Sequence, residues 1–285
     1  MPIRQITIVG TGLIGGSLGL ALRRARFAGS VVGCDRRAVL EAAQARGVID
    51  RAEADLERAI VGSDLIVLAT PVGCILSQLE AVGPLSASDA LITDTGSTKE
   101  QFVERARMIL GDKAAERVLP GHPMAGKEVG GIEQADAELF RDAVWLITPM
   151  DSQRPYTLRQ LEYLELLKAI GARVITMDAD RHDRLCAWIS HLPQMIATAL
   201  ASSLREELGD DEAVLQIGGR ALREMTRIAG SPYSMWRDIA MTNTENIEEA
   251  LLRFEQQIAH LRENLRGPGL REMFEAASEW GKTRC

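Results

Sequence analysis

The chain has 285 residues, which is enough for two ordinary domains that each bury a hydrophobic core. A formal net charge of −7 and a pI near 5.3 argue against nucleic acid or an anionic membrane as a partner. The first predicted strand begins by Ile3, which leaves no room for a signal peptide, and no apolar run approaches the length of a transmembrane helix. We therefore expect a cytoplasmic two-domain protein.

A glycine-rich turn follows the first predicted strand, at residues 6–9. Gly10 permits a tight turn, Gly12 lets a pyrophosphate approach the backbone, and Gly15 lets a helix over residues 17–26 pack close to the strand. The amides beside this turn then face the phosphates at a positive helix end. We predict a dinucleotide site that includes Gly10, Gly12, Leu13, Ile14 and Gly15.

A second apolar strand, at residues 30–34, ends in Asp35 at about the distance where an acidic side chain meets the adenosine ribose. A carboxylate accepts hydrogen bonds from both ribose hydroxyls of NAD and repels the 2′-phosphate of NADP. Arg36 and Arg37 follow directly and would soften this preference. We therefore expect NAD as the cofactor, bound in part by Asp35 and Arg36, with NADP as a secondary possibility.

Strand and helix patterns alternate through the first 180 residues. Residues 64–69 predict a buried, continuously apolar strand, which Thr70 and Pro71 follow directly. Ligands of such sheets bind at the carboxyl ends of the strands. We therefore include Thr70 and Pro71 in the predicted cofactor site. This alternation predicts a doubly wound Rossmann-type parallel sheet over residues 1–178. Its further strands are expected at residues 90–94, 117–120, 143–147 and 173–177, with a helix from Leu158 that ends at Gly171.

After Asp178 only helical periodicity remains, so the predicted fold class is α/β with a second, all-helical domain over residues 179–285. One stretch of this domain shows a narrow apolar seam with alternating steps of four and three residues, which is typical of a helix with a partner helix. The seam predicts a homodimer through this domain, and packing within one chain is the alternative. It consists of Ile247, Leu251, Phe254, Ile258, Leu261 and Leu265.

Polar residues follow two of the predicted strands, where ligands of α/β sheets bind. Ser97 stands three residues before Glu100, which is the spacing of a capping box, so helix capping alone could explain Ser97 and is compatible with ligand contact. His122 follows the strand predicted at residues 117–120 and is held extended by Pro123. Packing explains a histidine at this position poorly.

Two features of the second domain leave both a structural and a functional interpretation open. His191 lies beside an apolar helical stripe, where Pro193 should bend the helix, and such a histidine is often a core or interface residue. Arg220, Arg223 and Arg227 share one helical face, and charged stripes are mostly solvated surface. Neither zinc nor a disulfide framework is indicated by the four cysteines, which are scattered as Cys34, Cys74, Cys186 and Cys285.

Several blocks of the chain carry a resemblance that covers nearly its whole length. They are the turn at Gly10 and residues 94–99, 121–126, 190–193, 226–229 and 235–239. In this order they resemble the prephenate/arogenate (cyclohexadienyl) dehydrogenase family of tyrosine biosynthesis. The resemblance implies a nucleotide-binding domain followed by a helical, dimer-forming domain, with the active site in the cleft between them.

The resemblance also implies a reaction that needs no metal. Hydride leaves C4 of the cyclohexadienyl ring for the nicotinamide, the C4 hydroxyl loses its proton, and carbon dioxide departs from C1. Prephenate then gives 4-hydroxyphenylpyruvate, and arogenate gives tyrosine. By resemblance, His122 accepts the hydroxyl proton, a role that suits the pKa of imidazole, and Ser97 hydrogen-bonds to the imidazole or to the hydroxyl.

Substrate binding is implied for three further residues. Arg227 matches the arginine that holds a substrate carboxylate, and His191 lies in a block that lines the same pocket. Arg237 is either a second contact or the partner of Asp238. Gln194 stands where some relatives carry a second histidine.

Two rival functions would require different residues of this chain. A dehydrogenase of small 3-hydroxy acids usually places a lysine on a helix of its second domain, but this chain has no lysine between Asp178 and Arg266. A nucleotide-sensing protein without turnover would keep the fold and would not depend on His122 or Ser97.

Overall fold

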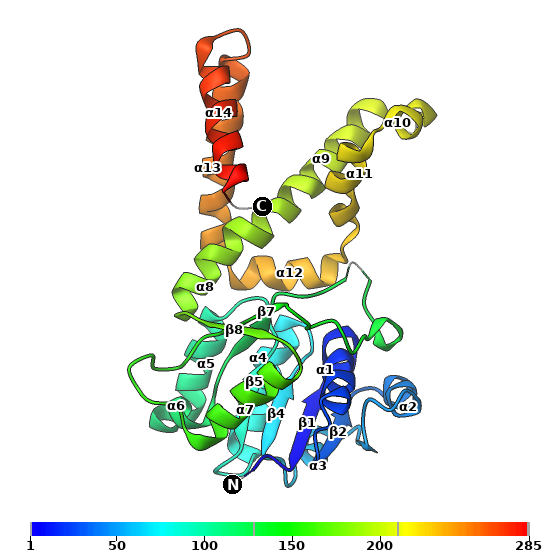
Figure 1. The fold of residues 1–285 in the computed structure, drawn as a ribbon, viewed down its shortest axis with the longest axis vertical. Coiled ribbons are helices and arrows are strands. Elements are labelled where there is room, and N and C mark those ends of the chain that lie inside the picture. The colour runs from blue at the N-terminus through cyan, green and yellow to red at the C-terminus, as the bar shows by residue number, and fades with distance from the viewer. Residues whose placement is uncertain (1, 128, 210, 284–285) are drawn as a thin grey trace.

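The computed structural model describes residues 2–127, 129–209 and 211–283, so Cys285 lies outside the described residues. The strands and their helices form one layered body, and the later helices rise from it in two arms (Figure 1). Within the described residues, no helix combines the length and the apolar character needed to cross a bilayer.

Five parallel strands form the first sheet, in the order β3-β2-β1-β4-β5, which confirms the predicted fold class. The strands predicted at residues 6–9, 30–34, 64–69 and 90–94 all form here. Helices cover both faces of this sheet, and its central strands are therefore buried and almost continuously apolar. The strands are β1 (Gln5–Val9), β2 (Ser30–Cys34), β3 (Arg51–Ala52), β4 (Leu65–Leu68) and β5 (Leu91–Asp94).

The helices that alternate with these strands follow the expected order. The first of them starts directly at the glycine-rich turn, four residues earlier than predicted. Their bounds are α1 (Leu13–Arg24), α2 (Arg37–Ala45), α3 (Leu56–Ala59), α4 (Val72–Leu85) and α5 (Glu100–Leu110), followed by the short turns η1 (Gly111–Lys113) and α6 (Ala114–Arg117).

A second, three-stranded sheet follows, in the order β6-β7-β8. Its first strand is antiparallel to the second, while the second and third are parallel and are joined by a crossover helix that starts with a capping box of Thr157 and Gln160. The elements are β6 (Gly121–Pro123), the turn η2 (Ile132–Gln134), β7 (Val144–Ile147), α7 (Leu158–Ala169) and β8 (Arg173–Thr176).

The prediction of a strand at residues 117–120 is wrong. Arg117 ends α6, and Val118 makes only a single parallel bridge to Ile92 of β5. The side-chain hydroxyl of Thr93 donates a hydrogen bond to the Leu119 carbonyl at 2.7 Å, and Pro120 has no amide to donate. A regular ladder of backbone hydrogen bonds with β5 therefore cannot form. The strand starts at Gly121 instead, and His122 therefore lies inside a strand rather than after one.

All described residues after Thr176 are helical or connecting. The helices are α8 (Ala179–Cys186), η3 (Ala187–His191), α9 (Leu192–Leu208), α10 (Glu212–Ile217), α11 (Arg220–Arg227), η4 (Ile228–Gly230), α12 (Tyr233–Thr242), α13 (Thr244–Glu263) and α14 (Pro268–Lys282). In Figure 1, α9 and α11 form one arm, and α13 and α14 form the other.

This helical part rests on the first sheet's helices, with α8 against α5 and α12 against α4. Asp238 of α12 accepts the amide of Gly73 at 3.1 Å. A Cβ atom at Gly73 would lie only 2.9 Å from this carboxylate, so glycine allows the close approach. The hydroxyls of Thr98 and Thr242 meet at 2.8 Å beside this contact.

Candidate active site

The glycine-rich turn has the geometry that a dinucleotide phosphate needs. Gly10 has a φ of +93°, and a Cβ there would lie 2.6 Å from the Ala69 carbonyl oxygen. A Cβ on Gly15 would lie 1.9 Å from the Gly10 carbonyl oxygen, so the helix could not pack this closely. At Gly12 a Cβ would meet no atom within 4 Å, and α1 begins there without a side-chain cap. Open space at uncapped helix amides fits an anion.

The other predicted cofactor residues stand at the same edge of the sheet. Asp35 follows β2, and its carboxylate accepts the amides of Thr11 at 2.8 Å and Arg36 at 2.7 Å. Thr70 and Pro71 follow β4, where the Thr70 hydroxyl donates to Gln78 at 2.7 Å and Pro71 precedes α4. The carboxyl ends of β1, β2 and β4 therefore meet at one surface.

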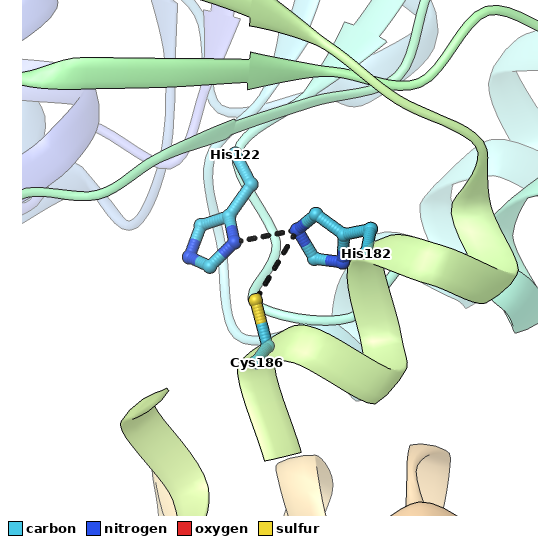
Figure 2. Close-up of side chains that lie close together, drawn as sticks. All are labelled: His122, His182 and Cys186. Carbon is cyan, nitrogen blue, oxygen red and sulfur yellow. Dashed lines mark hydrogen bonds between the residues drawn. The ribbon is translucent and has the colours of Figure 1, made fainter. Parts of the chain in front are cut away.

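His122 is the centre of a buried group of side chains. It pairs with Leu146 across β6 and β7, and its ring Nδ1 lies 2.9 Å from Nε2 of His182 on α8. The Sγ atom of Cys186, one turn further along α8, lies 3.7 Å from the same Nε2 (Figure 2). Sequence reasoning missed His182, whose ring is fully buried although it stands in a strongly polar helix.

Asp183 holds this group against α5. Its carboxylate accepts the backbone amides of Lys99 at 2.8 Å and Glu100 at 2.9 Å, and it lies 2.7 Å from Nδ1 of His182. The first amides of α5 are thus capped by a residue from another helix. The alternative that Ser97 caps this helix is not realised: Lys99 is the N-cap residue, no side chain caps the helix from that position, and Asp183 accepts the first amides instead.

A second buried carboxylate fixes the loop that carries Ser97. Asp94 accepts the ammonium group of Lys99 and, through the same oxygen, the Gly96 amide at 2.9 Å; its other oxygen accepts the Gly121 amide at 3.2 Å. This arrangement ties the loop after β5 to the start of β6. Ser97 is half-buried, and within the described residues it makes no hydrogen bond to His122.

His191 lies on η3, where the helix makes a π turn before Pro193 enters the first turn of α9. The sequence predicts a bend of the helix at Pro193, and the structure shows this π turn directly before it. Nδ1 of His191 lies 3.2 Å from the side-chain amide nitrogen of Asn243, and its ring meets Trp236 edge-on with 5.9 Å between ring centroids. Nε2 of His191 is buried and has no hydrogen-bond partner among the described residues.

The Asn243 amide fixes which nitrogen of His191 carries the proton. Its oxygen accepts from Asn246 at 2.8 Å, so its nitrogen is the group that faces the Asp183 carbonyl at 2.9 Å and His191. An amide nitrogen only donates, and Nδ1 of His191 is therefore the acceptor. In the neutral ring the proton is on Nε2, which makes this buried atom a donor for a ligand.

The two predicted arginines are placed on α11 and α12. Arg237 pairs with the neighbouring Asp238 at 2.7 Å, which is the alternative partner that the sequence left open. Arg227 ends α11, is exposed, and belongs to a helix that packs against α9 and η4. The structure does not bring either arginine into the buried group around His122.

Burial decides the protonation of the group. It lowers the pKa of His122 well below its ordinary value, with His182, Lys99 and His191 adding repulsion. Burial also lowers the pKa of His182, which Asp183 partly opposes, and lowers that of His191 to about 4. The pKa of the Cys186 thiol is raised to about 12 by the same cause. The three rings are thus neutral at neutral pH, and the thiol keeps its proton.

The ring nitrogens and the thiol of this group are atom types that also bind metal ions. One ligand-type atom each of His122, His182 and Cys186 lies within 4.8 Å of the others. Two ring nitrogens on a tetrahedral zinc ion would stand about 3.3 Å apart, given zinc–nitrogen bonds of about 2.0–2.1 Å. The observed 2.9 Å between the rings is hydrogen-bond distance, and the rings would have to separate to admit an ion.

A groove of about 910 Å³ lies elsewhere, between the start of α5, the loop after β7 and the start of α8. Its lining includes Arg107 but is dominated by carboxylates, which would repel a substrate with two carboxylates. These acidic residues are Glu100, Glu104, Asp151, Asp178 and Asp180.

The buried neutral histidines predict a loss of stability in mild acid. Unfolded histidines take up protons below about pH 6.5, whereas the folded rings resist protonation, so the free energy of unfolding should fall from pH 7 to pH 5. For His191 alone the loss at pH 5 is about 2 kcal/mol. Urea unfolding at pH 7 and at pH 5 measures this change. In His191→Asn the free energy of unfolding should depend less steeply on pH, by about one proton. An unchanged slope would contradict the burial argument.

Two family models match the chain in succession. The model described as prephenate dehydrogenase, nucleotide-binding domain, matches residues 18–176, and the model described as prephenate dehydrogenase, dimerization domain, matches residues 178–278. The prephenate dehydrogenase of Lactococcus lactis is 32% identical over 257 residues, which cover 90% of this chain and 70% of the relative.

Solved structures agree over the whole length. Prephenate dehydrogenase from Aquifex aeolicus, in complex with hydroxyphenyl propionate and NAD⁺, superimposes with a TM-score of 0.84 at 30% identity, covering 99% of this chain and 96% of that one. Synechocystis arogenate dehydrogenase superimposes with a TM-score of 0.79 at 29% identity, covering 99% of this chain and all of that one.

Proposed function

The chain belongs to the prephenate dehydrogenase family, and we propose that it oxidises prephenate, arogenate or both with NAD. It is an NAD-dependent oxidoreductase of the oxidative decarboxylation type. The observation that carries the proposal is His122, a buried and uncharged imidazole beside the carboxyl end of the nucleotide-binding sheet. Such a ring is a competent acceptor for the proton of an alcohol.

The residues present fit the cofactor. NAD, when bound, accepts the hydride that leaves the substrate. We assign its pyrophosphate to the amides after Gly12 and its adenosine ribose to Asp35, because the first has open space and the second has a fixed carboxylate at the end of β2. The carboxylate favours NAD over NADP, and Arg36 beside it leaves room for secondary use of NADP.

His122 removes the proton of the C4 hydroxyl as hydride leaves C4. The electron pair of the C1–carboxylate bond then enters the ring, carbon dioxide departs, the ring becomes aromatic, and the oxygen at C4 takes the proton back to give the phenol. Burial, with added repulsion from Lys99, keeps His122 unprotonated before the reaction. Ser97, half-buried on the loop between β5 and α5, is assigned to the same hydroxyl or to the imidazole.

Substrate carboxylates need donors within a negatively charged protein. We assign one contact to Nε2–H of His191, because this buried donor lacks a partner among the described residues. Arg227 is assigned to a carboxylate from the family motif, and Arg237 is a weaker candidate because Asp238 already neutralises it.

We divide the chain into a dinucleotide-binding domain, residues 1–178, and a substrate-binding and dimerisation domain, residues 179–285. The last strand ends at Thr176, and α8 begins at Ala179. We further propose that two copies associate through the helical domain, since much of the predicted seam is exposed in one copy. Ile258 is 49% exposed and Leu265 63%, and Phe274 of the adjoining α14 is 67% exposed.

The central test is turnover. Purified protein mixed with NAD and prephenate, or arogenate, should produce NADH absorbance. His122→Asn should lower kcat by about 10²–10⁴-fold and leave NAD affinity nearly unchanged, because the acceptor is lost while the nucleotide turn is intact. A near wild-type kcat in a folded variant would remove His122 from this role.

Cofactor choice should follow Asp35. Asp35→Ser removes the charge that repels the 2′-phosphate, so the ratio of kcat/KM for NAD to that for NADP should fall by about tenfold or more. Steady-state kinetics with each nucleotide measures this ratio. Equal discrimination before and after the change would show that the ribose is read elsewhere.

The assignment of Arg227 has a matched control on the same helix. Arg227→Ala should raise KM for the substrate by about 30-fold, equivalent to about 2 kcal/mol, because a carboxylate contact is lost. Arg223→Ala, at an exposed position four residues earlier, should leave KM within about twofold. Equal effects of the two changes would place Arg227 outside the site.

A further inference from the structure

Three side chains in a row connect the proton acceptor to a fixed negative charge. The Asp183 carboxylate lies 2.7 Å from Nδ1 of His182, and Nε2 of His182 lies 2.9 Å from Nδ1 of His122. We call this row the Asp–His–His triad. Figure 2 shows the two rings facing each other, with His182 presented by α8.

We propose that Asp183 and His182 are positioning residues that hold His122 in the tautomer able to accept the substrate proton and then share the resulting positive charge. This inference rests on the proposed function and deepens it.

The hydrogen bonds assign the proton on each ring. Both oxygens of Asp183 already accept backbone amides, so the carboxylate also acts as the acceptor toward Nδ1–H of His182. The neutral His182 ring then has a lone pair on Nε2. The proton between the two rings must therefore belong to Nδ1 of His122, and Nε2 of His122 is left with the lone pair that the reaction needs.

Proton transfer along the triad balances. As His122 Nε2 gains the hydroxyl proton, the proton on His122 Nδ1 passes to Nε2 of His182. One N–H bond breaks and one forms, and the positive charge comes to rest on His182, in contact with the Asp183 carboxylate. On His122 the same charge would face Lys99 without a carboxylate of its own.

The charges around the triad come from each element packed against it. Burial depresses the pKa of both rings, but only His182 has a carboxylate partner that raises it again. Positive charge is thus favoured at the His182 end. The titratable groups that face the two rings are Asp94, Lys99, Asp183, Cys186 and His191.

The decisive variant is Asp183→Asn. The asparagine oxygen can take the place of Oδ1, which accepts the Lys99 amide and faces His182 Nδ1, but the negative charge that stabilises a positively charged His182 is lost. We expect kcat to fall by about 10²–10⁴-fold, with the Kd for NAD within about threefold. The acidic limb of the kcat–pH profile should move to lower pH because the positive charge loses its carboxylate. Weakened folding alone would lower the plateau without moving the limb.

Two further variants distinguish the Asp–His–His triad from other roles of the buried group around His122. His182→Gln offers a carbonyl oxygen to His122 Nδ1 and keeps its tautomer, so the loss should be about tenfold and smaller than for Asp183→Asn. Cys186→Ala removes the sulfur beside the same nitrogen and should leave kcat within about threefold. A Cys186→Ala variant as damaged as His182→Gln, with wild-type activity lost to a chelator and restored by zinc, would identify a metal site and overturn the triad.

A direct measurement does not depend on any variant being active. The chain has only four histidines, so ¹⁵N-labelled histidine in the wild-type protein gives few signals. At neutral pH, His122 and His182 should both carry their proton on Nδ1. The opposite tautomer on His122, or wild-type kcat in a folded Asp183→Asn, would overturn the proposal.

The triad and the proposed function fail differently. Wild-type protein that turns over neither prephenate nor arogenate would refute the function. Active wild-type protein, a disabled His122→Asn and an unaffected Asp183→Asn would refute only the triad.

Discussion

The structure depends on one buried carboxylate. The Asp183 carboxylate caps the first amides of α5 and contacts His182. Its backbone carbonyl accepts a hydrogen bond from the side-chain amide of Asn243. It lies on the first helix after the sheets, so these contacts attach the helical part to the sheet part. Charge-assisted hydrogen bonds of this kind are strong, and a buried carboxylate that loses its donors is costly. These contacts therefore favour one arrangement of the helical part on the sheet part.

A second carboxylate complements the first from the other side. Asp94 binds Lys99 and two glycine amides, and a Cβ on Gly121 would lie 2.7 Å from the Trp145 indole nitrogen. The strand that carries His122 can therefore lie this close to Trp145 of β7 only with glycine at this position. Both carboxylates reach the segment that ends at Lys99, and the loop before α5 is held from two directions.

The nucleotide half of the fold was predictable because its signals are local. A strand, three glycines and an acid lie within about thirty residues, and their spacing decides the turn. His182 and Asp183 were not predictable in this way. The apolar residues Leu185 and Ile189 of this stretch are 40% and 63% exposed, so hydrophobicity does not mark its buried face. Packing of α8 on α5 buries the polar face instead, and only tertiary structure reveals that contact. The spacing left helix capping open for Ser97, and only the fold shows that Asp183 of α8 accepts the first amides of α5.

The sulfur beside the proton acceptor has a consequence for the chemistry that the protein can survive. Only thiolates react readily with peroxide or alkylating reagents, and burial keeps Cys186 protonated and covered. Cys34 is buried as well, whereas Cys74 is exposed in the first turn of α4. Of the three described cysteines, oxidants therefore reach Cys74 first, at the rim of the nucleotide surface, and the imidazole that takes the proton stays next to an unmodified thiol.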